Sequence, residues 1–212
     1  MAVAERRERE KEARRQQILD AAREVFMSKG FQEATIEEIA QKTELSKGTI
    51  YLYFQSKEEI YISLMHEGSQ ILYGMLKTAV EADLPADTLL RRLGRAYVQF
   101  YLEYTQYFRM LFLYYSSSAL HEKISPELCE KCEQQAKQSL ELVTGVIQKG
   151  MNEGIFKPCN PWEMAILLWS SQNGIILLGE RGDDQVLKLG TSLERIHDLF
   201  VESMLTSLKT GR

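Results

Sequence analysis

Apolar residues recur at spacings of three and four along almost the whole chain, and no segment shows sustained alternation of apolar and polar residues. This periodicity predicts an all-α fold of about nine helices. The four prolines fall where helices would begin or end, at Pro85, Pro126, Pro158 and Pro161. The predicted helices lie at residues 14–29, 35–42, 46–53, 56–81, 87–104, 106–114, 126–154, 161–178 and 191–208.

Hydroxyl side chains mark the starts of three predicted helices near the N-terminus. Thr35 and Ser56 each precede a glutamate by three residues, which is the pattern of a capping box, and Ser46 is placed to cap the short helix between them. Gly30 is expected to end the first helix because glycine tolerates a positive φ. Two short helices joined by a tight turn, after a longer first helix, have the layout of a helix-turn-helix.

The same segment contains enough apolar residues for a small three-helix core: Ile18, Phe26, Ile36, Ile39, Ala40, Leu45, Ile50 and Phe54. Gly48 lies near the start of the second short helix, where it costs about 1 kcal/mol of helix propensity relative to alanine. A glycine at this position makes sense if the backbone closely approaches another surface. The major groove of DNA is the obvious surface.

An ordered set of residues across positions 14–62 resembles the TetR family of bacterial transcriptional regulators. The matching residues are Ile18, Ala21, Ala22, Phe26, Gly30, Phe31, Thr35, Ile39, Ala40, Ser46, Lys47, Gly48, Thr49, Ile50, Tyr51, Tyr53, Phe54, Ser56, Lys57 and Glu58. The resemblance implies a dimeric DNA-binding repressor. We expect a charged tail at residues 1–13, a helix-turn-helix DNA-binding domain at 14–60, and a helical effector-binding and dimerisation domain at 61–212.

We call the helix-turn-helix domain at residues 14–60 the head. Eight of its residues are predicted to bind DNA: Thr35, Ser46, Lys47, Gly48, Thr49, Tyr51, Tyr53 and Lys57. Lys47, Thr49 and Tyr53 would reach base edges or nearby phosphates. The resemblance implies that Thr35, Ser46, Tyr51 and Lys57 clamp phosphates on either side, where helix N-termini also favour anions. The alternative is that the tyrosines only pack the core and the hydroxyl residues only cap helices.

One position departs from the family pattern. Many members have Ala-Gly in the turn where this chain has Thr43 and Glu44. If this position keeps a positive φ, a glutamate there is strained by on the order of 1 kcal/mol. Otherwise the turn has a different geometry, and the tilt of the recognition helix changes with it.

The tail before the head is densely charged. Residues 5–15 hold six basic side chains against four acidic ones. The segment could be an arm that touches the DNA backbone or minor groove. A solvated helical or frayed tail is the favoured interpretation.

We call the domain at residues 61–212 the body. The resemblance implies that it dimerises through its last two helices, at residues 162–178 and 191–208. The last helix has a wide apolar stripe, as expected of an element that packs on its own subunit and on a partner. The stripe consists of Leu193, Ile196, Leu199, Phe200, Val201, Met204 and Leu208. A homodimer places two heads on two half-sites, which predicts a palindromic operator in double-stranded DNA.

Residues 97–115 are unusually aromatic and, with apolar residues of neighbouring helices, could line an effector cavity. The predicted ligand-binding residues are Leu72, Met75, Tyr97, Tyr101, Tyr104, Phe108, Phe112, Trp169 and Gln172. Tyr97, Tyr101, Tyr104 and Phe108 share a face only if their helix is continuous. An aromatic stripe of this kind is more often core. A small apolar or aromatic effector is the expected ligand.

Composition restricts the other function classes. The hydrophobic fraction of 44% and charged fraction of 26% are those of a globular protein, and a net charge of −4 argues against nonspecific coating of nucleic acid. The N-terminus has no apolar leader, and the longest apolar run, 164–178, is interrupted by polar residues, so a cytoplasmic protein without a membrane segment is expected.

We expect no cofactor, no metal and no catalytic activity. Cys129 and Cys132 lie one helical turn apart, but a tetrahedral metal site needs four ligands, so two ordinary thiols are favoured. The three histidines lie in different segments, without a nucleophile or a glycine-rich phosphate loop. The alternative function is a TetR-like adaptor that acts through protein partners and binds DNA weakly, with no preference for sequence.

Overall fold

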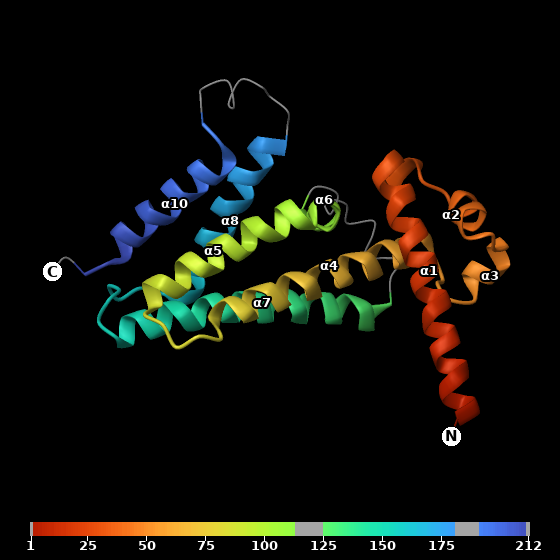
Figure 1. The fold of residues 1–212 in the computed structure, drawn as a ribbon, viewed down its shortest axis with the longest axis horizontal. Coiled ribbons are helices and arrows are strands. Elements are labelled where there is room, and N and C mark those ends of the chain that lie inside the picture. Colours follow the sequence, from red (N-terminus) through yellow and green to blue (C-terminus); the bar gives the residue numbers. More distant parts are fainter. Residues whose placement is uncertain (1, 113–124, 181–190, 211–212) are drawn as a thin grey trace. The chain divides into compact units, whose positions relative to one another are not determined.

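In a computed structural model, residues 2–112, 125–180 and 191–210 are described. Within these ranges the chain forms nine α-helices and, apart from one isolated β-bridge, no β-structure, which confirms the predicted all-α fold (Figure 1). The helices are α1 (Ala2–Glu33), α2 (Ile36–Thr43), α3 (Lys47–Tyr51), α4 (Lys57–Val80), α5 (Ala86–Glu103), α6 (Thr105–Phe112), α7 (Pro126–Asn152), α8 (Pro161–Glu180) and α10 (Leu193–Leu208).

Most boundaries fall close to the predicted ones, but α1 begins well before the predicted start at residue 14. Its first turns are exposed to solvent and hold an i,i+4 ion pair, Arg6 Nε to Glu10 Oε1 at 2.8 Å. Arginine, lysine, glutamate and alanine all favour helix, so this segment continues the helix without a core to pack on. The last residues of the predicted helix at 106–114 lie outside the described residues.

The chain folds into two compact units. The first contains residues 1–69 and 106–133, and the second contains residues 70–105 and 134–212. Three helical segments carry the chain across the boundary: α4, the junction of α5 with α6, and α7. The helix-turn-helix therefore forms one unit with α6, a grouping that helical periodicity alone does not reveal.

The first unit has the predicted three-helix core. Ile18, Ile39 and Ile50 are fully buried, and Phe26 and Phe54 are almost so. The ring of Tyr61, from α4, lies 5.5 Å from that of Phe26. Its hydroxyl donates to the Met110 carbonyl at 3.0 Å, so the same side chain also holds α6.

Tyr107 provides a second attachment of α6 to α1 and α4. The Arg23 guanidinium lies over the Tyr107 ring, 5.3 Å from its centroid, and donates to its hydroxyl. Arg23 is also paired with Asp20 at 2.8 Å. On the other side, a Cβ at Gly68 would lie 2.9 Å from the Tyr107 ring, so α4 needs a glycine there. Burial, together with Glu67, raises the pKa of Tyr107, which remains a neutral phenol.

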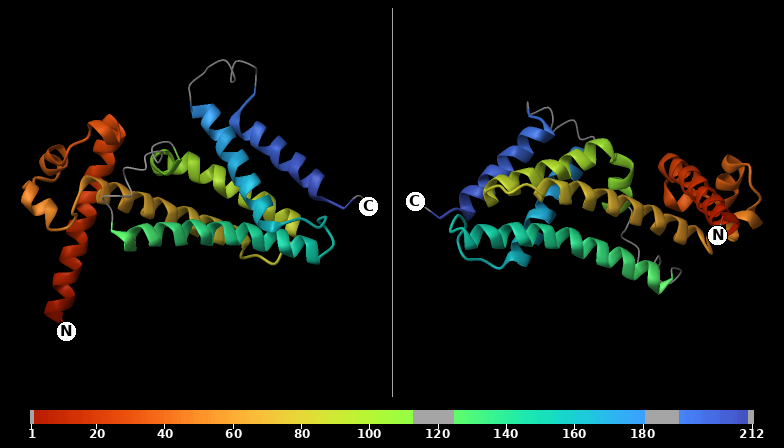
Figure 2. Two further views of the ribbon diagram at one scale, coloured as in Figure 1. Left: turned by 180° about the vertical axis from the view of Figure 1, so that it is seen from behind. Right: turned by 60° about the horizontal axis from the view of Figure 1, so that its bottom comes forward.

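In the second unit, the C-terminal segment lies beside the loop that follows α7 (Figure 2). After α7, Gly154 takes a positive φ of 71°, and the following residues pair with the end of α10. The Lys157 N–H donates to the Leu208 carbonyl at 2.8 Å, and the Thr210 N–H donates to the Ile155 carbonyl at 3.0 Å. Phe156, between these bonds, is only 2% exposed.

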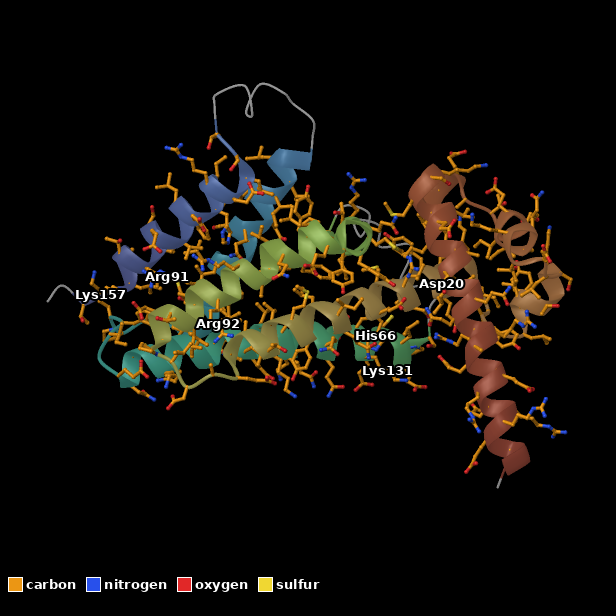
Figure 3. All side chains as sticks on the ribbon, in the orientation of Figure 1. Asp20, His66, Arg91, Arg92, Lys131 and Lys157 are labelled. Atoms are coloured by element: carbon orange, nitrogen blue, oxygen red, sulfur yellow. The ribbon has the colours of Figure 1, made fainter. Side chains whose placement is uncertain are left out.

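Ion pairs connect α5 to α10 in the second unit. Arg91, labelled in Figure 3, pairs with Glu202 at 2.6 Å and with Asp87 at 3.3 Å. Lys209 pairs with Asp87 at 2.7 Å, and this bond holds the pKa of the Asp87 carboxyl below its usual value. Partly exposed pairs of this kind stabilise weakly one by one, but a shared network fixes the orientation of α10.

Candidate DNA-binding interface and effector region

The capping box at the start of α2 fixes Thr35. Its Oγ1 accepts the Glu38 N–H at 3.3 Å, and the Glu38 carboxylate accepts the Thr35 N–H at 3.1 Å, as the sequence predicts. Glu38 also pairs with Lys29, and this contact is the main reason that its pKa is lowered. At α4, the Glu59 N–H donates to Ser56 Oγ at 3.0 Å, while the Glu59 carboxylate accepts the Gln55 N–H at 2.6 Å.

The turn between α2 and α3 keeps a left-handed residue. Glu44 has φ 55° and ψ 30°, so the strain expected for a glutamate at this position is present, on the order of 1 kcal/mol. The hydroxyl of Thr43, the buried residue before it, donates to the Ile39 carbonyl at 2.9 Å. Gln17 of α1 donates to the Thr43 carbonyl at 3.2 Å, which ties the turn to α1.

Ser46 caps α3, as predicted. The Thr49 N–H donates to Ser46 Oγ at 3.0 Å, and the two hydroxyl groups lie 2.9 Å apart. A Cβ at Gly48 would meet only Ser46 Oγ, at the ordinary contact distance of 3.7 Å. No neighbour among the described residues therefore requires a glycine at this position.

The two predicted lysines are placed differently. Lys47 is exposed and pairs with Glu37 at the surface. The Lys57 ammonium donates to the carbonyls of Phe31 at 2.7 Å, Ala34 at 2.8 Å and Gln32 at 3.2 Å. It also lies over the Phe31 ring, 4.5 Å from the centroid. Lys57 thus fastens the start of α4 to the end of α1, a structural role that the sequence pattern did not suggest.

Among the predicted DNA-binding residues, Thr35, Ser46, Lys47, Gly48 and Tyr51 are exposed, whereas Thr49, Tyr53 and Lys57 are half-buried. Sequence reasoning passed over Leu52, which is 81% exposed directly after α3. Its apolar character pointed to the core. Its position four residues after Gly48 and two after the fully buried Ile50 is the signal that it faces outward.

Two family profiles match the chain. The profile described as "Bacterial regulatory proteins, tetR family" matches residues 18–64, and "Tetracyclin repressor-like, C-terminal domain" matches residues 90–204, more than half of the chain. The chain belongs to the TetR family. It is therefore a helix-turn-helix DNA-binding transcriptional regulator of a ligand-binding family, and the second match extends the resemblance from the head to the body.

The individual relatives match this TetR-family chain over segments of different length. The fatty acid metabolism regulator protein of Bacillus subtilis is 42% identical over 59 residues, 28% of this chain and 30% of the relative. The HTH-type transcriptional activator FasR of Mycolicibacterium smegmatis is 30% identical over 102 residues, 48% of this chain and 47% of the relative. The chain thus spans less than half of the length of either relative.

The solved structure of the transcriptional regulator FadR from Bacillus subtilis in complex with stearoyl-CoA has the same fold. It superposes with a TM-score of 0.69 at 22% identity and covers 91% of this chain and 98% of that one. This similarity extends across both units of the TetR-family chain. At this level of identity it establishes the fold alone.

The second unit has a groove of about 470 Å³ between α4 and α5. It is lined by Ile71, Gly74, Met75, Thr78, Ala96, Gln99, Glu103 and Tyr104. The groove brings together two of the predicted ligand-binding residues, Met75 and Tyr104. Glu103 and Gln99, joined by a 2.7 Å hydrogen bond, add polar groups to the lining, as do the hydroxyl residues Thr78 and Tyr104.

Other predicted ligand-binding residues lie where α5, α8 and α10 pack together. The Tyr97 hydroxyl donates to Asn173 Oδ1, and burial raises the pKa of Tyr97, to which Trp169 is also hydrogen-bonded. Gln172 Nε2 lies 3.1 Å from His197 Nε2. Leu72 is buried and Tyr101 half-buried. These positions favour a core role for Tyr97.

Phe108 and Phe112 lie in the first unit, with ring centroids 4.7 Å apart. Tyr104, with φ −122° and ψ 40°, separates α5 from α6. The shared face that needed a continuous helix therefore does not extend from α5 to Phe108. The two phenylalanines belong with the head and α6.

Cys132 has an environment that disfavours its thiolate. Burial, with smaller effects of Cys129 and Glu133, raises the pKa of the Cys132 thiol to about 11. Nucleophilic cysteines have a lowered pKa, so Cys132 lacks the environment of a reactive thiol. In the described part of the chain no three His, Cys, Asp or Glu side chains are grouped to hold a metal. None of the described helices is long and apolar enough to cross a membrane.

His197 predicts a loss of stability in acid. Its side chain lies between α5 and α8 and is only 3% exposed. Burial lowers the pKa of His197, and this effect exceeds the opposing effect of Asp198. The unfolded chain therefore takes up the proton first. The contribution of neutral His197 to the free energy of unfolding is present above about pH 6.5. It is lost as the pH falls from there to the pKa of His197 in the folded protein, by up to about 1.4 kcal/mol per pH unit.

Urea denaturation at pH 7.5 and pH 5.5 measures this loss, and His197→Gln should reduce it. The pKa of His66 is also lowered, by burial and then by Lys131, which lies beside it in Figure 3. His66→Gln is therefore the matched variant, and the double variant should lose most of the pH dependence. A His197→Gln protein with the full acid loss would contradict the assignment.

Proposed function

We propose that the protein is a dimeric repressor that binds a palindromic operator and is released by a small molecule with an apolar or aromatic group. The observation that carries the proposal is the outer surface of the head. There Lys47, Gly48 and Tyr51 are exposed on α3, while Ile50 of the same helix is fully buried. The core fixes the helix, and its polar and basic side chains face solvent, where Lys47 would exchange its exposed ion pair with Glu37 for a contact with DNA.

Residues 14–60 are assigned the DNA-reading role. A recognition helix places side chains on base edges in the major groove, and flanking groups position it on phosphates. Lys47, Thr49 and Tyr53 are the assigned base-edge or phosphate contacts. Thr35, Ser46 and Tyr51 are assigned to phosphates. Lys57, whose ammonium already bonds three carbonyls, adds positive charge beside the start of α4.

Residues 61–212 are assigned effector binding and dimerisation. α8 carries five large apolar side chains that are between 39% and 56% exposed: Trp162, Ile166, Leu167, Trp169 and Leu178. Leu199 of α10 is 68% exposed. Apolar residues in this number on two neighbouring helices are typical of a surface that a second subunit covers.

Ile166→Glu tests the dimer. A charge in the middle of an apolar subunit interface should convert the protein to a monomer and weaken operator binding by at least about 100-fold, because each head then binds alone. Lys77→Glu, a change of an exposed charge on α4, is the control and should remain dimeric. Analytical ultracentrifugation gives the mass. If the Ile166→Glu protein is still a dimer, α8 does not form the subunit interface.

The effector is assigned to the apolar class. The groove with Met75 and Tyr104 offers an apolar surface with polar groups at Gln99 and Glu103. One relative is named for fatty acid metabolism, and a solved structure of the same fold is a complex with stearoyl-CoA, so a long acyl chain attached to CoA is the first apolar group to test. An effector releases the operator only if it binds one of two conformations more tightly, so its effect on DNA affinity measures this difference.

Selection from a random duplex pool with purified full-length protein tests the central proposal. We expect a palindrome, bound by two protomers, whose affinity falls at least about tenfold with saturating stearoyl-CoA. CoA without an acyl chain is the control. A pool that yields no palindrome overturns the repressor assignment, whereas an enriched palindrome unaffected by acyl-CoA overturns only the effector class. A promoter–reporter measurement gives the sign of regulation.

A further inference from the structure

The outermost ridge of α3 consists of a glycine and a leucine. With roughly 100° between successive residues of a helix, Gly48 and Leu52 both point about 160° away from Ile50. Ile50 is fully buried in the head, whereas Leu52 is 81% exposed, more than any other large apolar side chain in the described part of the chain. Leu52 has φ −74° and ψ −18°, so helical geometry continues through it.

Gly48, one helical turn before Leu52, leaves a stretch of backbone without a side chain. The two positions are four residues apart, so they lie on the same face of the helix. Gly48 contributes no side chain, and the nearest atom to a Cβ placed there would be Ser46 Oγ at 3.7 Å. The ridge therefore combines one branched apolar group with a backbone that a second surface can approach closely.

We propose that Leu52 contacts the C5-methyl group of a thymine in each operator half-site and selects thymine at that position. The inference rests on the proposed function, because α3 must enter the major groove for the contact to form. Thymine is the base that presents a methyl group on its major-groove edge, and apolar side chains recognise it by direct contact. Leu52 is thereby a specificity-determining residue, in addition to the polar residues of α3.

The surroundings of Leu52 favour a base edge over a protein partner. The exposed residues next to it in sequence or on the helix surface are Lys47, Gly48, Tyr51 and Gln55, none of them aliphatic. A docked protein needs a continuous apolar patch of several hundred Å². Leu52 and the adjacent Tyr51, whose ring ends in a hydroxyl group, form only a small apolar surface, which suits a methyl group on a base edge.

A double-mutant cycle between protein and DNA tests the contact. The operator is first selected with full-length wild-type protein, and each thymine of its half-site is then replaced by deoxyuridine, which lacks only the methyl group. At one thymine, we expect wild-type affinity to fall about fourfold per half-site. For Leu52→Ala the same replacement should change affinity by less than about 1.5-fold. Leu102→Ala, another exposed leucine, should behave as the wild type.

The outcomes separate the inference from the proposed function. Equal losses for wild type and Leu52→Ala at every thymine, or a half-site without a methyl-sensitive position, overturn the leucine contact while leaving operator binding intact. A pool that enriches no operator overturns both. A repeated selection with Leu52→Asn provides a second measurement, because asparagine pairs with adenine and should change the preferred base at that position. An unchanged preference would contradict the proposal.

Discussion

Gly48→Ala is expected to lower operator affinity by about 10- to 100-fold without destabilising the protein. The added methyl group meets only Ser46 Oγ at 3.7 Å within the head, so folding is not impaired, and helix propensity favours alanine by up to about 1 kcal/mol. At the DNA surface the same methyl group must fit between α3 and the base edges. Overpacking of a close contact costs typically about 1–3 kcal/mol, which corresponds to the predicted loss.

Operator affinity and the free energy of unfolding by urea are both measured for Gly48→Ala. The affinity should fall, whereas the free energy of unfolding should stay the same or rise. Gly145→Ala is the matched control. Gly145 lies in α7, and a Cβ at this position would have no neighbouring atom within 4 Å, so the substitution should stabilise the protein and leave DNA affinity unchanged. A Gly48→Ala protein that binds as tightly as the wild type would show that α3 does not approach the groove closely.

Local features of the head could be predicted from the sequence because a few neighbouring residues determine them. The capping box of Thr35 and Glu38 and the positive φ of Gly30 need only the residues within one turn. Glu44 is instructive, since a glutamate gives no local reason for a positive φ. The family pattern left two turn geometries open at that position, and the structure has the left-handed one, next to the contacts that Thr43 makes within α2 and with α1.

Features that depend on distant residues could not be predicted in this way. The ammonium of Lys57 lies on carbonyls more than twenty residues earlier in the chain, and only the fold brings them together. The same holds for Tyr107, whose sequence neighbours suggested an effector cavity but whose partners are Arg23 and Gly68. Aromatic residues carry apolar area without specifying the surface that buries it.

Gly150 is the position in the second unit where a small substitution should have the largest effect on stability. A Cβ at Gly150 would lie 2.0 Å from Cδ2 and 2.4 Å from Cε2 of Phe156. The ring is 2% exposed, and the Phe156 N–H donates to the Gly150 carbonyl at 3.0 Å. Gly150→Ala should therefore destabilise the protein by at least about 3 kcal/mol, at the upper end of overpacking effects.

The ring of Phe156 cannot move aside without a further loss. Ile155 and Lys157, its two neighbours, pair with Thr210 and Leu208, so a shift of the ring also breaks the bonds that hold the C-terminal segment. Urea denaturation of Gly150→Ala against Gly145→Ala compares the same substitution in the same helix, with opposite expected signs. Shortening the ring in Gly150→Ala/Phe156→Leu should recover part of the loss. Equal stability of the two alanine variants would show that α7 and the Phe156 segment are not packed in this way.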